Sequence, residues 1–200
     1  MQLHKRDVVD AATTLLDNFG IADLTMRRLA RELDVSPGAL YWHFANKQQL
    51  LGAVADRILN SVDDVPGGWR ERVAGACGRL RDALLSHTDG AELVSASFAA
   101  GQSEAMARTL ARLTDAAADA GVHPSHAELA ARTVVYYVLG FTADEQSRLQ
   151  WDAVGAELPD GQSVLSEDPG ARFAFGLRLL VDGIAAHSHA ETTVSAGKSE

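Results

Sequence analysis

Residues 24–47, LTMRRLARELDVSPGALYWHFANK, constrain the fold more than any other part of the chain, because they encode two short helices separated by a tight turn. Thr25 is a favourable N-cap residue, so a helix is expected to begin just after it. Ser36 followed by Pro37 is a second start signal, since proline at the first helical position loses no hydrogen bond. This arrangement predicts a helix-turn-helix.

Each of the two helices has one face that can pack in the core and another face that is free to contact a different molecule. At 100° per residue, the first helix carries apolar side chains on one side and arginines on the other. The apolar side consists of Met26, Leu29, Ala30 and Leu33, and the basic side consists of Arg27, Arg28 and Arg31. The second helix is anchored by Leu40 and Phe44, and small, aromatic and imidazole side chains cover the rest of it. Such a surface favours a recognition helix for DNA.

We expect this motif to contact both the backbone and the bases of a double-stranded DNA operator. The phosphate contacts would come from Arg27, Arg28, Tyr41, His43 and Lys47, and the base-edge contacts from the small tip residues Pro37, Gly38 and Ala39. The complete set of expected DNA-binding residues is Arg27, Arg28, Ser36, Pro37, Gly38, Ala39, Tyr41, Trp42, His43 and Lys47. The alternative is that the aromatic residues pack against neighbouring helices and the arginines form a solvated face.

The distribution of charge is compatible with such a partner. The chain of 200 residues has a net charge of -9, but residues 1–47 hold six basic and six acidic side chains, against twelve and twenty-one in residues 48–200. All of the excess negative charge therefore lies outside the motif. A neutral head with one basic face can still bind phosphate, while an acidic body is repelled from the duplex and helps to orient the protein.

Other classes of protein are disfavoured by what the sequence lacks. A single cysteine, Cys77, excludes an intramolecular disulfide framework and a cysteine-based zinc site, which fits a cytoplasmic protein. No stretch approaches the ~18 apolar residues of a membrane helix, so no membrane partner is expected. His123 and His126 have no further ligands beside them, and no catalytic or nucleotide-binding motif occurs. We therefore expect no metal, no cofactor and no enzymatic activity.

Helical periodicity recurs along the whole chain, which predicts an all-α fold. A three-helix head, residues 1–47, is expected on a larger helical body, residues 48–187, with a connector helix over 47–60. In the first helix Val8, Ala12, Leu15 and Phe19 share one face, and Gly20 marks its end. Residues 188–200 are small and polar and are expected to form a disordered tail.

Two helices of the body are predicted to form a dimer interface. A capping box of Ser125 and Glu128 predicts the start of a long helix that ends near Arg148. The last helix, residues 171–186, is apolar over so much of its circumference that it needs partners on more than one side. We expect these two helices from each of two protomers to form a four-helix interface in a homodimer.

The segment LTMRRLARELDVSPGALYWHFANKQQLL resembles the DNA-binding region of the tetracycline-repressor (TetR) family, in which Leu-Tyr-Trp-His/Tyr-Phe followed by Asn/Ser-Lys is a signature. Further along, LLSHTDGAEL, VLGFTADEQ and FAFGLRLLVDGI resemble segments of the ligand-binding domain of the tetracycline-repressor subgroup. The resemblance implies a homodimeric repressor that occupies a palindromic operator and is released by a small molecule. A ligand-independent or activating DNA-binding regulator remains an alternative, and so does an enzyme or interaction module.

The resemblance also implies an effector pocket in the body. Its candidate walls are Cys77, Leu80, Leu84, Val94, Phe98, Met106, Leu110 and Tyr136, although periodicity cannot separate a pocket from a core. In the tetracycline-binding subgroup an Asn, a His and a Glu contact the drug or its magnesium, and a gapless alignment places Ala76, Val94 and Asp144 there. Only the carboxylate is retained. We therefore expect a largely apolar effector other than tetracycline–magnesium, for which Asp144 would accept a donor or balance a positive charge.

Overall fold

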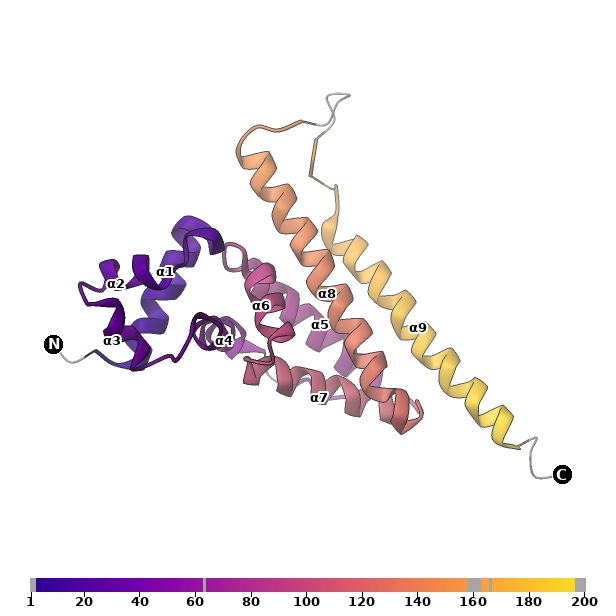
Figure 1. Cartoon of the computed structure of the whole chain (residues 1–200). Helices are drawn as coiled ribbons and strands as arrows, with labels where there is room; N and C mark the ends of the chain where they lie inside the picture. The colour runs from indigo at the N-terminus through magenta and orange to yellow at the C-terminus, as the bar shows by residue number, and fades with distance from the viewer. Residues whose placement is uncertain (1–2, 63, 158–162, 166, 197–200) are drawn as a thin grey trace.

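The computed structural model describes residues 3–62, 64–157, 163–165 and 167–196, and it is built from helices. A small N-terminal head lies beside a larger body, and the two longest helices extend across the body and beyond it (Figure 1). An isolated antiparallel bridge joins Glu157 to Ser163. Within the described residues, no helix combines the length and the apolar character needed to cross a membrane.

The order of elements confirms the predicted all-α architecture. The head contains α1 (Lys5–Asp23), α2 (Met26–Glu32) and α3 (Pro37–Tyr41), and α4 (Lys47–Ile58) with the 3-10 turn η1 (Leu59–Ser61) leads into the body. The body contains α5 (Trp69–Leu85), α6 (Gly90–Ala99), α7 (Glu104–Asp119), α8 (Pro124–Ala153) and α9 (Pro169–Ala196).

The helix starts in the head are set by polar caps, as the sequence predicts. Thr25 Oγ1 accepts a hydrogen bond from Arg28 N at 3.2 Å, and Ser36 Oγ accepts one from Ala39 N at 3.3 Å. These side chains satisfy amide groups that would otherwise have no partner in the first turn. The head core then closes over fully buried side chains from all of its helices: Val8, Leu15, Leu16, Leu24, Leu29, Leu40 and Phe44.

The end of α1 differs from the prediction. Gly20 does adopt a left-handed φ of 77°, but the helix resumes after this kink and continues to Asp23. Phe19, expected on the packed face, is 51% exposed. Its ring lies just before the kink, beyond the edge of the head core, and the guanidinium of Arg28 covers it at 3.9 Å from the ring centre.

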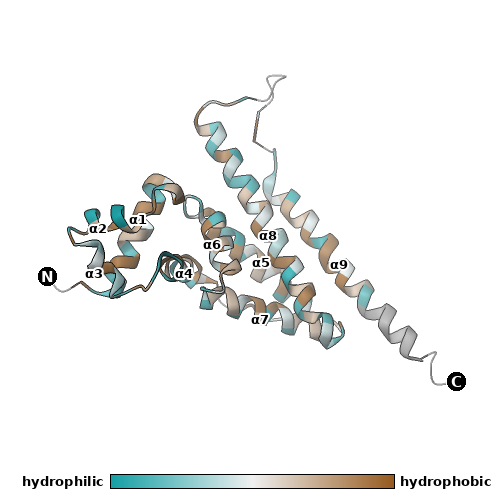
Figure 2. Cartoon of the chain, in the orientation of Figure 1, coloured by the Kyte–Doolittle hydropathy of each residue, from teal (hydrophilic) through white to brown (hydrophobic). Residues whose placement is uncertain are grey.

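The body is a layer of shorter helices against which α8 and α9 lie (Figure 1). Hydrophobic residues recur along α8 and α9, whereas hydrophilic residues gather on α2 in the head (Figure 2). The buried face of α8 includes Val135, Val138 and Thr142, and Leu177 and Val181 are buried on α9. The core is thus continuous from the head through α4 into the body.

Two predicted boundaries in the body are wrong. The N-cap of α8 is His123, whose Nδ1 accepts from Ser125 N at 3.3 Å, so Ser125 and Glu128 form no capping box. Glu128 instead accepts a hydrogen bond from Arg132 at 2.8 Å, one turn along the exposed helix. The helix also continues past Arg148 to Ala153, because the first glycine after it is Gly155.

The last helix is longer than predicted. Residues 188–196, expected to be a disordered tail, have helical backbone, because the sequence contains no proline or glycine between Gly183 and Gly197 to end the helix. The remainder of the expected tail, residues 197–200, lies outside the described residues.

Candidate nucleic-acid interface

The tip of α3 is an open surface. Ser36, Pro37 and Gly38 are exposed at its start, Tyr41 is 51% exposed and Trp42 is 90% exposed. An indole exposed to this extent does not belong to a core, so the alternative in which the aromatic residues pack between helices fails for Trp42. The tip therefore carries two aromatic side chains that the head itself does not use for packing.

The small residues at this tip are not required by the fold. A Cβ added to Gly38 would meet only the Ser36 hydroxyl, at 3.7 Å, which is an ordinary contact. Ala39 is half-buried and donates its N–H to the Ser36 cap. The backbone at the start of α3 can therefore approach another molecule closely.

The arginines of α2 have different surroundings. Arg27 is exposed and forms no ion pair within the described part of the chain. Arg28, also expected to contact phosphate, is half-buried, forms an ion pair with Asp23 and covers Phe19. Arg28 pairs with Asp23 through one nitrogen of its guanidinium, so a phosphate contact from Arg28 would share this group with the end of α1.

Lys47 is the first residue of α4, directly after the cap. Asn46 Oδ1 accepts a hydrogen bond from Gln49 N at 2.9 Å and so caps the start of α4. The start of a helix favours anions because its amide groups and the helix dipole both attract negative charge. Half-buried His43 precedes this turn in the chain, so the head presents a second candidate phosphate contact beside the α3 tip.

Both parts of the chain match known families. Residues 8–54 match the family described as bacterial regulatory proteins of the tetR family, and residues 63–160 match the tetracyclin repressor-like C-terminal domain. The tetracycline repressor protein class A from transposon 1721 of Escherichia coli is 32% identical over 201 residues, which cover 92% of this chain and 91% of that protein. The chain belongs to the TetR family.

Solved structures of TetR-family proteins agree with this assignment. BioQ of Mycobacterium smegmatis is 62% identical, with a TM-score of 0.84 over 92% of this chain and 99% of that chain. A BioQ structure with its natural double-stranded DNA operator is 61% identical, with a TM-score of 0.81 over 93% of this chain and 100% of that chain. The matched families and relatives are transcriptional regulators rather than enzymes, and this TetR-family chain is a DNA-binding transcriptional regulator.

Most of the residues expected to line an effector pocket lie in the core of the TetR-like body. Cys77, Leu80, Leu84, Val94 and Met106 are each at most 1% exposed. Burial in apolar surroundings raises the pKa of the Cys77 thiol to about 12, so it stays protonated at neutral pH and is a poor nucleophile. These residues contribute to packing whether or not they also face a ligand.

Of the other expected pocket residues, Leu110 and Phe98 pack against this core, whereas Tyr136 and Asp144 lie at the surface. Leu110 and Phe98 are half-buried, and the Phe98 ring meets Tyr136, which is 57% exposed, edge-on at 6.2 Å. Asp144 is exposed and accepts a hydrogen bond from Arg148 at 2.8 Å. It faces a hollow of about 120 Å³ under the segment between α8 and α9. The structure thus places the carboxylate at the surface, apart from the aliphatic core residues.

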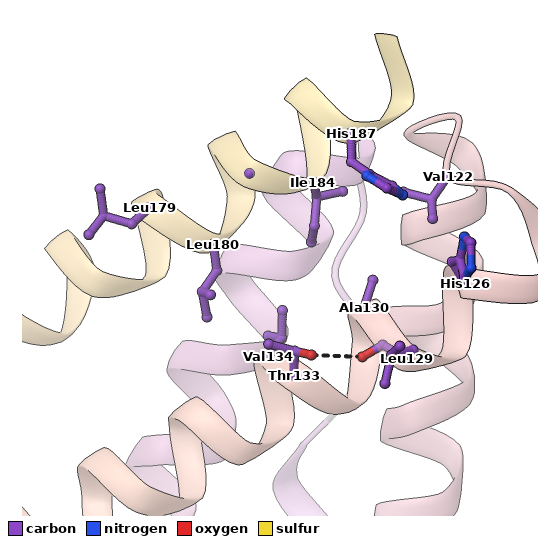
Figure 3. Close-up of a pocket in the computed structure, with 11 residues that line it drawn as sticks. Val122, His126, Leu129, Ala130, Thr133, Val134, Leu179, Leu180, Ile184 and His187 are labelled. Atoms are coloured by element: carbon purple, nitrogen blue, oxygen red, sulfur yellow. Dashed lines mark hydrogen bonds between the residues drawn. The ribbon is translucent and has the colours of Figure 1, made fainter. Parts of the chain in front are cut away.

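An apolar cavity of about 500 Å³ lies between α8 and α9 (Figure 3). Leu179, Leu180 and Ile184 of α9 line it on one side, and Leu129 and Val134 of α8 line it on the other. At one end the rings of His126 and His187 meet edge-on at 5.9 Å. The cavity opens away from the core, and Leu129 and Leu179 at its opening are 62% and 59% exposed.

An exposed stripe of apolar and small residues continues from this cavity along α8, and the sequence reasoning missed its extent. We call it the α8 stripe: the exposed residues Leu129, Thr133, Tyr136, Gly140, Ser147 and Trp151, together with half-buried Ala143. Phe175, Leu179 and Gly183 form a matching exposed row on α9. The three-to-four residue spacing was visible in the sequence, but small residues such as Gly140 carry no hydrophobic signal of their own.

Proposed function

We propose that the protein is a homodimeric repressor that binds a palindromic operator through its two heads and releases it when a small molecule binds the body. The observation that carries this proposal is the combination, in one chain, of an unpacked α3 tip and a long uncovered apolar stripe. The α3 tip is free to contact DNA, and the stripe is free to pack against another copy of the chain.

The dimer is supported by the area that the two long helices leave uncovered. With 30 and 28 residues, α8 and α9 are each about 42 to 45 Å long at 1.5 Å per residue. The exposed rows cover part of that length, from Leu129 to Trp151 on α8 and from Phe175 to Gly183 on α9. Extended apolar rows at a monomer surface mark interaction sites. A two-fold copy could pack against the α8 stripe and the exposed row of α9.

The operator contact is supported by the head. We assign Pro37, Gly38 and Ala39 to base edges, because only small side chains separate the backbone there from a groove. Tyr41, His43 and Lys47 would contact phosphates, with Arg27 beside them, and Trp42 and Ser36 would lie along the backbone of the duplex. In a two-fold dimer the two tips would enter major grooves ~34 to 36 Å apart.

An effector site in the body is supported by one buried group. Ser97 is 2% exposed on α6, and its hydroxyl has no hydrogen-bond partner among the described residues. Buried hydroxyls are usually paired, so a ligand that separates α6 from its neighbours would gain this bond. The expected walls of the effector pocket, Val94 and Met106 among them, are mainly aliphatic and aromatic, which favours a largely apolar molecule. Such a ligand need only prefer the body conformation that holds the heads at the wrong separation.

The test begins with DNA. The purified protein is used to select duplexes from a random pool, and the selected operator is footprinted. We expect a palindrome whose half-sites are one helical turn, or a multiple of it, apart. Lys47→Ala should weaken binding to all duplexes alike and lower the salt slope by about 1. A selected pool without enrichment, or an asymmetric single site bound by a monomer, would contradict the proposal.

The effector is tested on the same operator. A library of apolar metabolites is screened by thermal shift, and each stabilising compound is titrated into the protein–operator complex. A compound with ~100-fold preference for the released state would shift the equilibrium substantially. If every stabilising compound leaves operator affinity unchanged, the ligand-independent regulator becomes the better description.

A further inference from the structure

The turn between α5 and α6, residues 86–89, attaches the head to the body at a place distinct from α4. Asp17, on α1, has its carboxylate 3.0 Å from Nδ1 of His87, and its carbonyl accepts a hydrogen bond from Thr88 Oγ1 at 2.9 Å. Asp89 Oδ2 accepts a hydrogen bond from Ile21 N at 2.9 Å. The C-terminal end of α1 is therefore held by three consecutive residues of the body.

The backbone on both sides of this contact is shaped to allow it. Asp89 has a left-handed φ of 53°, which is unusual for a residue with a side chain. Opposite it, Gly20 has a φ of 77°, and a Cβ added there would lie 2.6 Å from Asp89 Oδ2. The kink in α1 and the left-handed Asp89 together bring the carboxylate to the Ile21 amide.

The same turn is fixed to α8 by Gln146, whose side chain is buried. Its Nε2 donates to Leu84 O at 3.1 Å and to His87 O at 2.7 Å, while its Oε1 accepts from Ala91 N at 3.0 Å. These bonds use both ends of one amide to close the α5–α6 turn against α8. One helical turn further along α8, Gln150 Nε2 donates to Asp89 Oδ1 at 2.5 Å. Asp89 thus accepts from α1 with one oxygen and from α8 with the other.

The second attachment of the head runs through α4. Asp56 Oδ1 accepts from Ser103 Oγ at 2.7 Å and from Ala105 N at 2.9 Å, which fixes α4 to the start of α7. A rigid head held only at α4 could swing about that contact. A head that is also held at the end of α1 has this motion restricted, because the two attachments lie on different helices of the head.

We infer that Asp89, with Gln150, is a positioning residue for operator recognition: it holds each head at a fixed angle to α8 and so fixes the half-site spacing that the dimer accepts. The inference rests on the proposed function, because α8 carries the proposed dimer interface. Adding one base pair between half-sites moves the second groove by about 3.4 Å and rotates it about the duplex axis. Only a dimer with firmly held heads rejects such a change.

The informative variant is Asp89→Gly. Glycine accepts the left-handed φ at this position without strain, so the turn is retained while both hydrogen bonds are lost. Asp89→Asn keeps one acceptor oxygen and serves as the conservative rescue. Gln150→Ala removes only the α8 side of the link. Glu92→Gln is the matched control, because it removes one negative charge from the exposed first turn of the same helix.

The probes are the palindromic duplex that the wild-type protein selects from random DNA, the same duplex with one base pair removed or added between half-sites, and a single half-site. We expect wild type and Glu92→Gln to prefer the selected spacing. Asp89→Gly should bind that duplex about 10-fold more weakly, lose most of the spacing preference, and keep wild-type affinity for the half-site. Asp89→Asn should recover part of the preference, and Gln150→Ala should lose part of it.

Two results would overturn the inference while leaving the proposed function intact. One is a wild-type spacing preference in Asp89→Gly. The other is uniform weakening on every duplex, half-site included, together with a lower thermal midpoint, which is the signature of a merely structural role. If wild-type protein selects no two-fold operator at all, the proposed function and this inference fail together.

Discussion

Gly38 lies exposed near the start of α3, where the fold does not require its lack of a side chain. A Cβ at this position makes only an ordinary contact with Ser36 Oγ, at 3.7 Å. We therefore expect Gly38→Ala to leave the free energy of unfolding unchanged or to raise it by up to about 1 kcal/mol. Operator affinity should fall about 10-fold or more, because the methyl group would meet the groove floor.

Chemical denaturation and operator titration measure the two effects of Gly38→Ala separately. Gly78→Ala is the matched control, since Gly78 lies inside α5 with nothing within 4 Å of an added Cβ. It should give the same small stabilisation with unchanged operator affinity. Wild-type affinity in Gly38→Ala would remove the α3 tip from the base-reading surface.

Among the elements, α4 packs very closely against the turn between α6 and α7. A Cβ on Gly52 would lie 2.1 Å from the carbonyl oxygen of Gln102, in the turn between α6 and α7, and a backbone atom cannot move aside as a side chain can. Gly52→Ala should therefore lower the free energy of unfolding by about 1 to 3 kcal/mol, as overpacking does elsewhere. Gly78→Ala again provides the control, because it should raise the free energy of unfolding slightly rather than lower it. Equal stability of the two variants in urea titrations would show that α4 is not tightly docked.

At the scale of the whole molecule, we expect the α8 stripe and the exposed row of α9 to decide the oligomeric state. Leu179 is 59% exposed in the chain, and the proposed dimer would bury it. Leu179→Glu should weaken dimerisation by ~100-fold or more, because an unpaired charge would be buried at the interface. Sedimentation equilibrium measures this, and Ala111→Glu on the exposed side of α7 adds the same charge elsewhere. Dimers of unchanged affinity in Leu179→Glu would place the interface on another surface.

Much of the head could be predicted from the sequence, because its signals are local. Thr25 and Ser36 cap helices by bonding to amide groups three residues away, and the burial of Leu29 and Leu40 follows from helical spacing. Prediction failed where two neighbouring residues could each cap the same helix. His123, directly before Pro124, caps α8 in place of Ser125, because its own side chain accepts a hydrogen bond from the first turn.

Only the tertiary structure decided which residues far apart in the chain are in contact. Asp89 and Ile21 are 68 positions apart, so no periodicity or cap signal relates them, and the bond exists only because α1 kinks at Gly20 beside the α5–α6 turn. Sequence determines which face of a helix is apolar, since that depends on neighbours within a few residues. Which apolar faces remain uncovered depends on how the helices pack, and on α8 and α9 that uncovered surface is the one a second copy would bury.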